Sequence, residues 1–147
     1  MLKLTTKQRY AARIMVFLAG ADHGDRPSRK KEIALAEDIP ADYVEQICMK
    51  LKTGGLIRSH RGKQGGFSLA CDPGRITVAD VMEAVEGPTP LAPCLDDKCR
   101  RSSGCAMRPV WQQANDALQK VLRSVTVGQL AQNAKKMESA RAISFEI

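Results

Sequence analysis

The chain has 147 residues, of which 44% are hydrophobic and 27% are charged, and its formal net charge is +7. This length is enough for one domain with a sizeable core plus an extension, and the composition is typical of a soluble globular protein. The start of the chain is too polar for a secretory signal, and Arg9 and Arg13 interrupt an apolar stretch that is too short to span a membrane. We therefore expect a cytoplasmic protein with reduced thiols and no membrane association.

The positive charge is concentrated in the first half of the chain. Residues 1–67 hold 13 lysines and arginines against 7 acidic residues, whereas residues 68–147 hold 10 against 9. A basic half joined to a nearly neutral half indicates a polyanionic partner for the first half, most often nucleic acid. A well-solvated surface without such a partner is the alternative.

Helically spaced apolar residues predict three helices before residue 55. The residue before a proline disfavours helical backbone, so the break at Ile39-Pro40 separates the second helix from the third. The predicted order is a helix after the caps Thr5 and Thr6, a loop at residues 24–27, a short helix after Ser28, and a third helix from Pro40 or Ala41 to Thr53.

The pattern then changes to two short strand-like pieces, residues 56–59 and 67–70. The loop between them is rich in glycine and carries Arg61 and Lys63. This arrangement predicts a β-hairpin with a basic tip.

The remaining sequence predicts three more helices and one loop. A short helix is capped by Thr77 and stopped by Gly87, and a final helix begins near Thr126. Between them lie a loop at residues 88–105 and a long helix after Cys105. The long helix carries an apolar stripe that a slim domain could hardly bury alone: Trp111, Leu118, Val121 and Val125.

These elements predict a mainly α fold with a small β-hairpin wing, that is, a winged helix-turn-helix domain plus a long dimerisation helix. We expect a DNA-binding domain at residues 1–87, a cysteine-bearing sensor loop at residues 88–105, and a dimerisation helix with a C-terminal segment at residues 106–147. A symmetric homodimer would read two half-sites of a palindromic operator in double-stranded DNA.

The third helix and the hairpin tip are the candidate DNA interface, because an α-helix fits the major groove and a basic hairpin can reach phosphates or the minor groove. The predicted exposed side of that helix carries Asp42, Tyr43, Glu45, Gln46 and Lys50. Gln46 can pair with adenine edges, and Glu45 can accept a hydrogen bond from cytosine. Lys30, Lys31 and Lys50 are placed to contact phosphates. A winged helix that binds protein instead is the alternative.

Three segments, "LTTKQRYAARIMVFLA", "YVEQICMKLKTGGLIRSHRGKQGGFSLA" and "ITVADVMEAVEG", carry a more specific signal. In order and spacing they resemble the bacterial regulators that include IscR, NsrR and RirA, from residue 2 to about residue 125. The resemblance implies a homodimeric transcription factor and not an enzyme. It implies base-reading positions at Glu45 and Gln46 and a wing arginine at Arg61. Gln8 and the Lys63-Gln64 pair depart from the usual pattern of that family.

Cys94, Cys99 and Cys105 lie close together in the predicted loop among charged residues, serines and a glycine. Three thiolates in a flexible loop suit an iron–sulfur cluster. A metal-free thiol switch is an alternative, and a zinc site fits less well because it usually needs four ligands. The resemblance implies that the three cysteines ligate a [2Fe–2S] or [4Fe–4S] cluster. Cys48 is expected in the core, and Cys71 has no assigned role.

Arg108 stands where IscR-like members have a histidine, and a protonated arginine is not an ordinary ligand. The fourth ligand is therefore left open among Asp96, Asp97, a side chain of a partner protomer and a small molecule. An open site of this kind predicts a sensor. An enzyme is disfavoured, because His23 and His60 lie in or near loops without a nucleophile. The alternative function is a winged-helix regulator controlled by metal-free thiol redox chemistry or by a protein partner.

Overall fold

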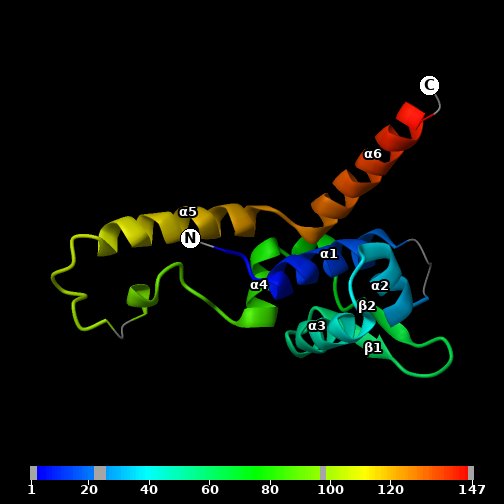
Figure 1. Cartoon of the computed structure of the whole chain (residues 1–147), viewed down its shortest axis with the longest axis horizontal. Helices are drawn as coiled ribbons and strands as arrows, with labels where there is room; N and C mark the ends of the chain where they lie inside the picture. Colours follow the sequence, from blue (N-terminus) through cyan, green and yellow to red (C-terminus); the bar gives the residue numbers. More distant parts are fainter. Residues whose placement is uncertain (1–2, 22–25, 97–98, 146–147) are drawn as a thin grey trace.

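The computed structural model describes residues 3–21, 26–96 and 99–145. Within these ranges the chain is mainly helical with one two-stranded antiparallel sheet, as predicted (Figure 1). In chain order the elements are α1 (Thr6–Gly20), α2 (Lys30–Glu37), α3 (Ala41–Thr53), β1 (Ile57–His60), β2 (Gly66–Leu69), the 3-10 turn η1 (Pro73–Arg75), α4 (Val78–Glu86), the 3-10 turn η2 (Pro93–Leu95), α5 (Arg108–Ser124) and α6 (Val127–Phe145). Part of the predicted loop at residues 24–27 lies outside the described residues.

One apolar core joins α1, α2, α3, α4 and β1. Ile14 and Met15 of α1, Ile47 and Leu51 of α3, and Val81 of α4 are all almost completely buried. Burial of each such aliphatic side chain stabilises the fold by about 1.5–3 kcal/mol. The core therefore fixes α3 by its apolar side and leaves its other side at the surface.

The helix ends follow local capping rules. Thr5 and Gln8 form a capping box at the start of α1, and Thr77 and Asp80 form another at the start of α4, as predicted for Thr77. Asp38 ends α2 in the left-handed region at φ 50°, and α3 starts directly after Pro40. This tight connection forms the turn between the two helices of the helix-turn-helix unit.

The strands of the wing differ by one residue from their predicted bounds. β1 lies one residue later than the predicted 56–59, and β2 lies one residue earlier than the predicted 67–70. β1 and β2 pair from Ile57 opposite Leu69 to His60 opposite Gly66. Ser28, which is buried, adds a further bridge by exchanging two backbone hydrogen bonds with Phe67 of β2. Ser28 therefore extends the wing sheet, and the N-cap of α2 is the next residue along the chain.

The two C-terminal helices differ in how they meet this body. Figure 1 shows α5 lying along one side and α6 projecting away at its far end. The start of α6 packs against α1, and Val127 and Ala131 are buried there. All of α5 is described, and none of its residues is buried. In the described part of the chain, no helix is both long and apolar enough to cross a membrane.

Candidate nucleic-acid interface and cysteine loop

The surface side of α3 carries the polar side chains that the sequence predicted. Asp42, Glu45, Gln46 and Lys50 are exposed, whereas the opposite side of the helix is buried in the core. A helix that is packed on the core by its apolar side and exposes its polar side can enter a major groove and contact base edges.

Tyr43 was predicted to lie on the exposed side of α3, and this prediction is wrong. Its ring is half-buried and meets the ring of Tyr10 edge-on, with centroids 5.6 Å apart and an interplanar angle of 76°. The guanidinium of Arg13 lies over the Tyr10 ring, and Arg13 also bonds to Glu37 at the end of α2. Tyr43 lies one helical turn before Ile47, so it marks the border of the buried side and helps to hold α3 against α1.

Lys30 differs from the other predicted phosphate contacts because its side chain is paired with a carboxylate. Its Nζ is 2.6 Å from Oε2 of Glu45, so the first residue of α2 forms an ion pair with the exposed side of α3. The hydrogen bond to Glu45 raises the pKa of Lys30 above its ordinary value. Lys31 is exposed, in keeping with its predicted role. Sequence reasoning could not anticipate the pair, because the two residues are 15 positions apart on different helices.

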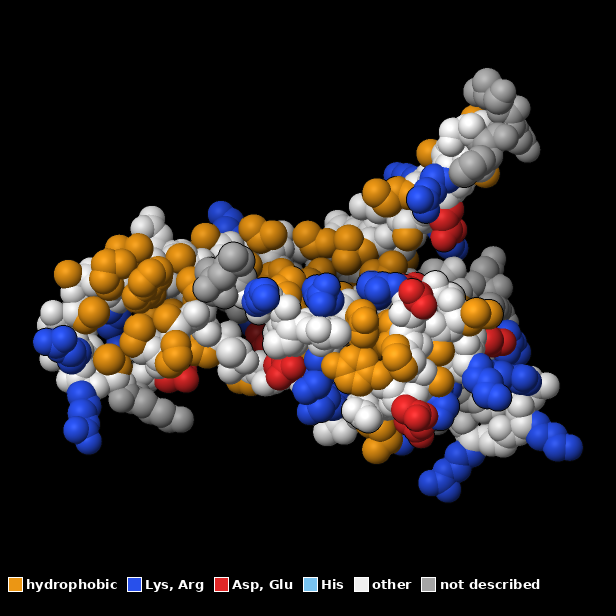
Figure 2. Space-filling model, in the orientation of Figure 1, with side chains coloured by type: hydrophobic (Ala, Val, Ile, Leu, Met, Phe, Trp, Pro, Cys, Tyr) orange, Lys and Arg blue, Asp and Glu red, His pale blue; other side chains and the backbone are white. Residues whose placement is uncertain are grey.

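The wing presents Arg61 and Lys63 at its exposed tip. Figure 2 shows lysine and arginine side chains projecting from the end of the molecule that carries the hairpin. Arg29, which the sequence analysis did not single out, donates a hydrogen bond from Nη2 to the backbone carbonyl of Lys63 at 3.2 Å. This bond connects the start of α2 to the wing loop, so the two basic parts of the candidate interface are held together.

The three loop cysteines are free thiols, and each is half-buried. Cys94 lies within η2, and Cys105 lies just before α5. Nη1 of Arg108 donates a hydrogen bond to the backbone carbonyl of Cys94 at 2.9 Å. The backbone N–H of Leu91 donates to Oδ1 of Asn115, also on α5. The start of the loop is thus attached to α5 at two points.

The donor type of this loop fits an iron–sulfur cluster, because thiolates are the usual ligands. The described residues, which exclude residues 97–98, contain no group of three His, Cys, Asp or Glu side chains close enough to hold one metal ion. Among the candidate fourth ligands, Asp96 is exposed and Asp97 lies outside the described residues.

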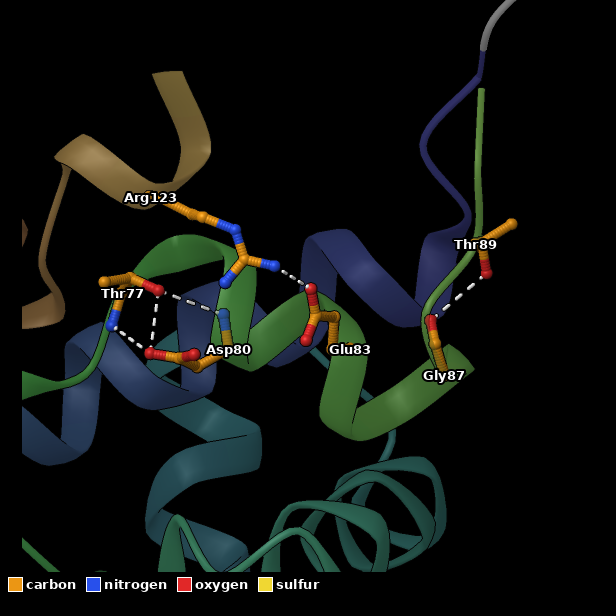
Figure 3. Close-up of polar contacts among 6 residues, drawn as sticks. All are labelled: Thr77, Asp80, Glu83, Gly87, Thr89 and Arg123. Atoms are coloured by element: carbon orange, nitrogen blue, oxygen red, sulfur yellow. Dashed lines mark hydrogen bonds and ion pairs between the residues drawn. The ribbon is translucent and has the colours of Figure 1, made fainter. Parts of the chain in front are cut away.

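The far end of α5 is connected to the core through α4. Nη2 of Arg123 lies 2.5 Å from Oε1 of Glu83, and Figure 3 shows this ion pair beside the capping box at the start of α4. On its other side α4 touches α3 so closely that a Cβ on Gly54 would lie 2.7 Å from Cβ of Ala84. A continuous chain of contacts therefore runs from α5 through α4 to the end of α3.

Comparison with protein families gives one match that covers most of the chain. Residues 4–133 match the Rrf2 family, described as "Iron-dependent Transcriptional regulator". The chain belongs to the Rrf2 family. This match confirms the resemblance seen in the sequence, and the solved structures described below confirm the winged helix-turn-helix fold class.

Named relatives of this Rrf2-family chain are transcriptional regulators and not enzymes, as predicted. The HTH-type transcriptional regulator CymR of Bacillus subtilis is 36% identical over 130 residues, which cover 88% of this chain and 90% of CymR. IscR of Cronobacter sakazakii is 30% identical over 139 residues, which cover 93% of this chain and 85% of IscR.

Solved structures show the same fold. The structure of B. subtilis CymR, named the global cysteine regulator, has a TM-score of 0.75 and covers 90% of this chain and 98% of that one. The structure of T. potens IscR also has a TM-score of 0.75, is 30% identical, and covers 92% of this chain and 90% of that one. The chain is thus a DNA-binding transcriptional regulator of the Rrf2 family.

Proposed function

We propose that this chain is a dimeric transcriptional regulator whose DNA binding is controlled by an iron–sulfur cluster held by Cys94, Cys99 and Cys105. One observation carries the proposal: three free, half-buried thiols occupy a single loop that is attached to the start of α5 by Arg108. The sensor loop at residues 88–105 would then lie between a DNA-binding unit, residues 1–87, and a dimerisation unit, residues 106–147.

Positively charged groups lie near the three thiols in the chain. Arg100 and Arg101 are exposed within the loop, and Cys105 lies just before the positive end of α5. Thiolate is the form of cysteine that binds metal, and positive groups beside an anionic cluster would offset its charge. When bound, a cluster would supply redox chemistry whose potential depends on hydrogen bonding and solvent exposure.

The route from the loop to the DNA follows the contacts already described. Ordering of the loop would fix the start of α5, because Arg108 and Asn115 of α5 already bond to the backbone at the start of the loop. The Arg123–Glu83 ion pair would transmit that position to α4, and the close Gly54–Ala84 approach would transmit it to α3. The loop then acts as a two-state element whose equilibrium a ligand biases.

In the DNA complex, α3 would enter the major groove with Glu45 and Gln46 reading bases and Asp42 and Lys50 beside them. Arg61 and Lys63 of the wing would reach the backbone or the neighbouring minor groove, and Lys31 would contact phosphates.

A second protomer would cover the exposed apolar stripe of α5. Trp111, Leu118 and Val121 are 38%, 41% and 60% exposed, respectively. Figure 2 shows hydrophobic side chains over much of this helix. A two-fold dimer through α5 would present two copies of α3 to the half-sites of a palindromic operator.

Control by a metal-free thiol or by a protein partner is the second candidate. It is favoured by the 36% identity to CymR of B. subtilis, the global cysteine regulator, and by a structure of Staphylococcus aureus CymR in an oxidized form that is 31% identical. Under this alternative the loop thiols would respond directly to oxidants, and purified protein would contain no iron or sulfide.

The proposed control is tested by comparing two forms of the same protein. Duplexes are first selected from a randomised double-stranded DNA library, and their affinities are then measured for protein reconstituted anaerobically with iron and sulfide and for cluster-free protein. The proposal predicts a clear difference in affinity between the two forms. Equal affinities would contradict control of DNA binding by the cluster.

A further inference from the structure

The ion pair between Lys30 and Glu45 lies on the side of α3 that is proposed to face DNA. The Nζ–Oε2 distance is 2.6 Å, and the two side chains are 35% and 54% exposed. Lys30 begins α2 and Glu45 lies in the second turn of α3, so the pair spans the angle between the two helices of the helix-turn-helix unit.

The first half of α3 is acidic, because Asp42 lies one turn before Glu45 and both are exposed. Two carboxylates brought close to DNA repel the phosphates, and each loses hydration as it enters the groove. Lys30 forms an ion pair with Glu45. Its charge offsets that of one carboxylate, and its hydrogen bond restricts the position of that carboxylate.

A lysine in this position differs from a phosphate contact. A phosphate contact supplies affinity that is independent of sequence and increases the salt dependence of binding. A lysine already bonded to a base-reading carboxylate acts mainly through that carboxylate, by fixing which hydrogen-bond donor on a base it can reach. Lys30 and its neighbour Lys31 therefore differ in their surroundings: Lys30 is paired with Glu45, and Lys31 is exposed. The sequence alone predicted the same phosphate-binding role for both.

We propose that Lys30 is a positioning residue that determines the base preference of Glu45, rather than a phosphate contact. The inference rests on the proposed role of α3 as the recognition helix. With the pair intact, the positive charge of Lys30 offsets that of Glu45 and holds its carboxylate in one orientation. In that orientation Glu45 accepts a hydrogen bond from a cytosine amino group. Without Lys30, the carboxylate is uncompensated and can adopt other rotamers, so its base preference relaxes.

The test uses five forms of the full chain: wild type, Lys30→Met, Glu45→Gln, the double variant, and Lys31→Met as the matched control. Each is used to select duplexes from a randomised double-stranded DNA library. The position read by Glu45 is defined as the base pair at which the wild-type and Glu45→Gln selections differ. We expect Lys30→Met to alter the preference at that same base pair and Lys31→Met to leave it unchanged.

Affinities provide the second readout. For the wild-type duplex, Lys30→Met should weaken binding by about five-fold, the upper end for an exposed ion pair, and by less than about two-fold in the Glu45→Gln background. The slope of log affinity against log salt should fall by about one for Lys31→Met and stay the same for Lys30→Met. If Lys30 only stabilised α2, Lys30→Met would not change the base preference at one specific base pair.

If Lys30→Met keeps the wild-type preference and lowers the salt slope as Lys31→Met does, Lys30 is a phosphate contact and the inference is wrong. If Glu45→Gln selects the wild-type sequence, Glu45 reads no base and the inference is also wrong. If a sixth form, Gln46→Ala, selects the wild-type sequence as well, α3 does not read bases. That last result would overturn the proposed placement of the recognition helix, and it is distinct from the others.

Discussion

Arg123 near the end of α5 and Glu83 of α4 form an ion pair with a 2.5 Å distance between Nη2 and Oε1 (Figure 3). The pair connects the helix that follows the cysteine loop to the helix that packs against α3. Both side chains are partly exposed, so the pair contributes at most about 1 kcal/mol to stability. The pair would therefore matter mainly because it couples the position of α5 to the position of α4.

Arg123→Ala should reduce the difference in DNA affinity between reconstituted and cluster-free protein, because α5 would no longer be held to α4 at this point. Lys120→Ala, one turn earlier on the same helix, is the control and should retain the full difference. Titration of a selected duplex with both forms of each variant provides the measurement. An unchanged difference in Arg123→Ala would show that coupling does not pass through this pair.

Binding to DNA should depend on the wing and on the exposed side of α3. Gln46→Ala is expected to cost about 1–3 kcal/mol on a selected duplex and to relax the base preference. Arg61→Ala should weaken binding, whereas Arg141→Ala, which removes the same charge from exposed α6, should not. Normal affinity in both Gln46→Ala and Arg61→Ala would mean that the interface lies elsewhere.

The exposed apolar stripe of α5 predicts a dimer in solution. Light scattering of the wild type should give twice the monomer mass of 16.1 kDa. Leu118→Asp and Val121→Asp place a charge in the stripe and should shift the mass towards the monomer, because a buried unpaired carboxylate is costly. Leu35→Asp is a suitable control, since Leu35 is 88% exposed on α2. A monomeric wild type at micromolar concentration would contradict the proposed assembly.

Cys48 provides a pH-dependent prediction that concerns the core. Burial, with a smaller contribution from the negative charge of Glu45, raises the pKa of the Cys48 thiol from 9.0 to about 12. The unfolded chain releases this proton near pH 9 while the folded chain keeps it, so stability is fully present below pH 9 and is lost as the pH rises from 9 towards 12. The expected slope is about 1.4 kcal/mol per pH unit.

Urea unfolding at pH 8, 9 and 10 measures this slope. Cys48→Ala should be less stable than the wild type at pH 8, because it leaves a small cavity, but its stability should fall less steeply above pH 9. Parallel pH profiles for the two proteins would show that Cys48 does not titrate in this way.

Much of the fold is predictable because it depends on local chemistry. The boxes at Thr5 and Thr77, the break at Pro40 and the stop at Gly87 each depend on residues within a few positions in the sequence. The wing strands differ from the predicted ones only at their ends, because the pairing continues one residue further towards the tip, at His60 opposite Gly66, which the sequence pattern does not mark. The bridge from Ser28 to β2 was not predictable, because Ser28 lies far earlier in the chain.

The details of the candidate site were less predictable, because they depend on contacts between helices. The partners Arg123 and Glu83 are 40 positions apart, and nothing in the local sequence connects them. Tyr43 lies at the border of the buried side of α3, where helical periodicity alone does not assign exposure. Arg108 departs from the family pattern as a ligand, and the structure assigns it a different contact, with the backbone of Cys94.

Iron and acid-labile sulfide content, measured on anaerobically reconstituted protein together with its visible spectrum, test the central claim most directly. The wild type should contain both, and Cys94→Ser, Cys99→Ser and Cys105→Ser should each lose or destabilise the cluster. Cys48→Ser, Cys71→Ser and Arg108→Ala should retain it, because neither a core thiol, a distant exposed thiol nor an arginine is an expected ligand. A full cluster in the triple Cys94, Cys99 and Cys105 variant, or no cluster in the reconstituted wild type, would contradict the account.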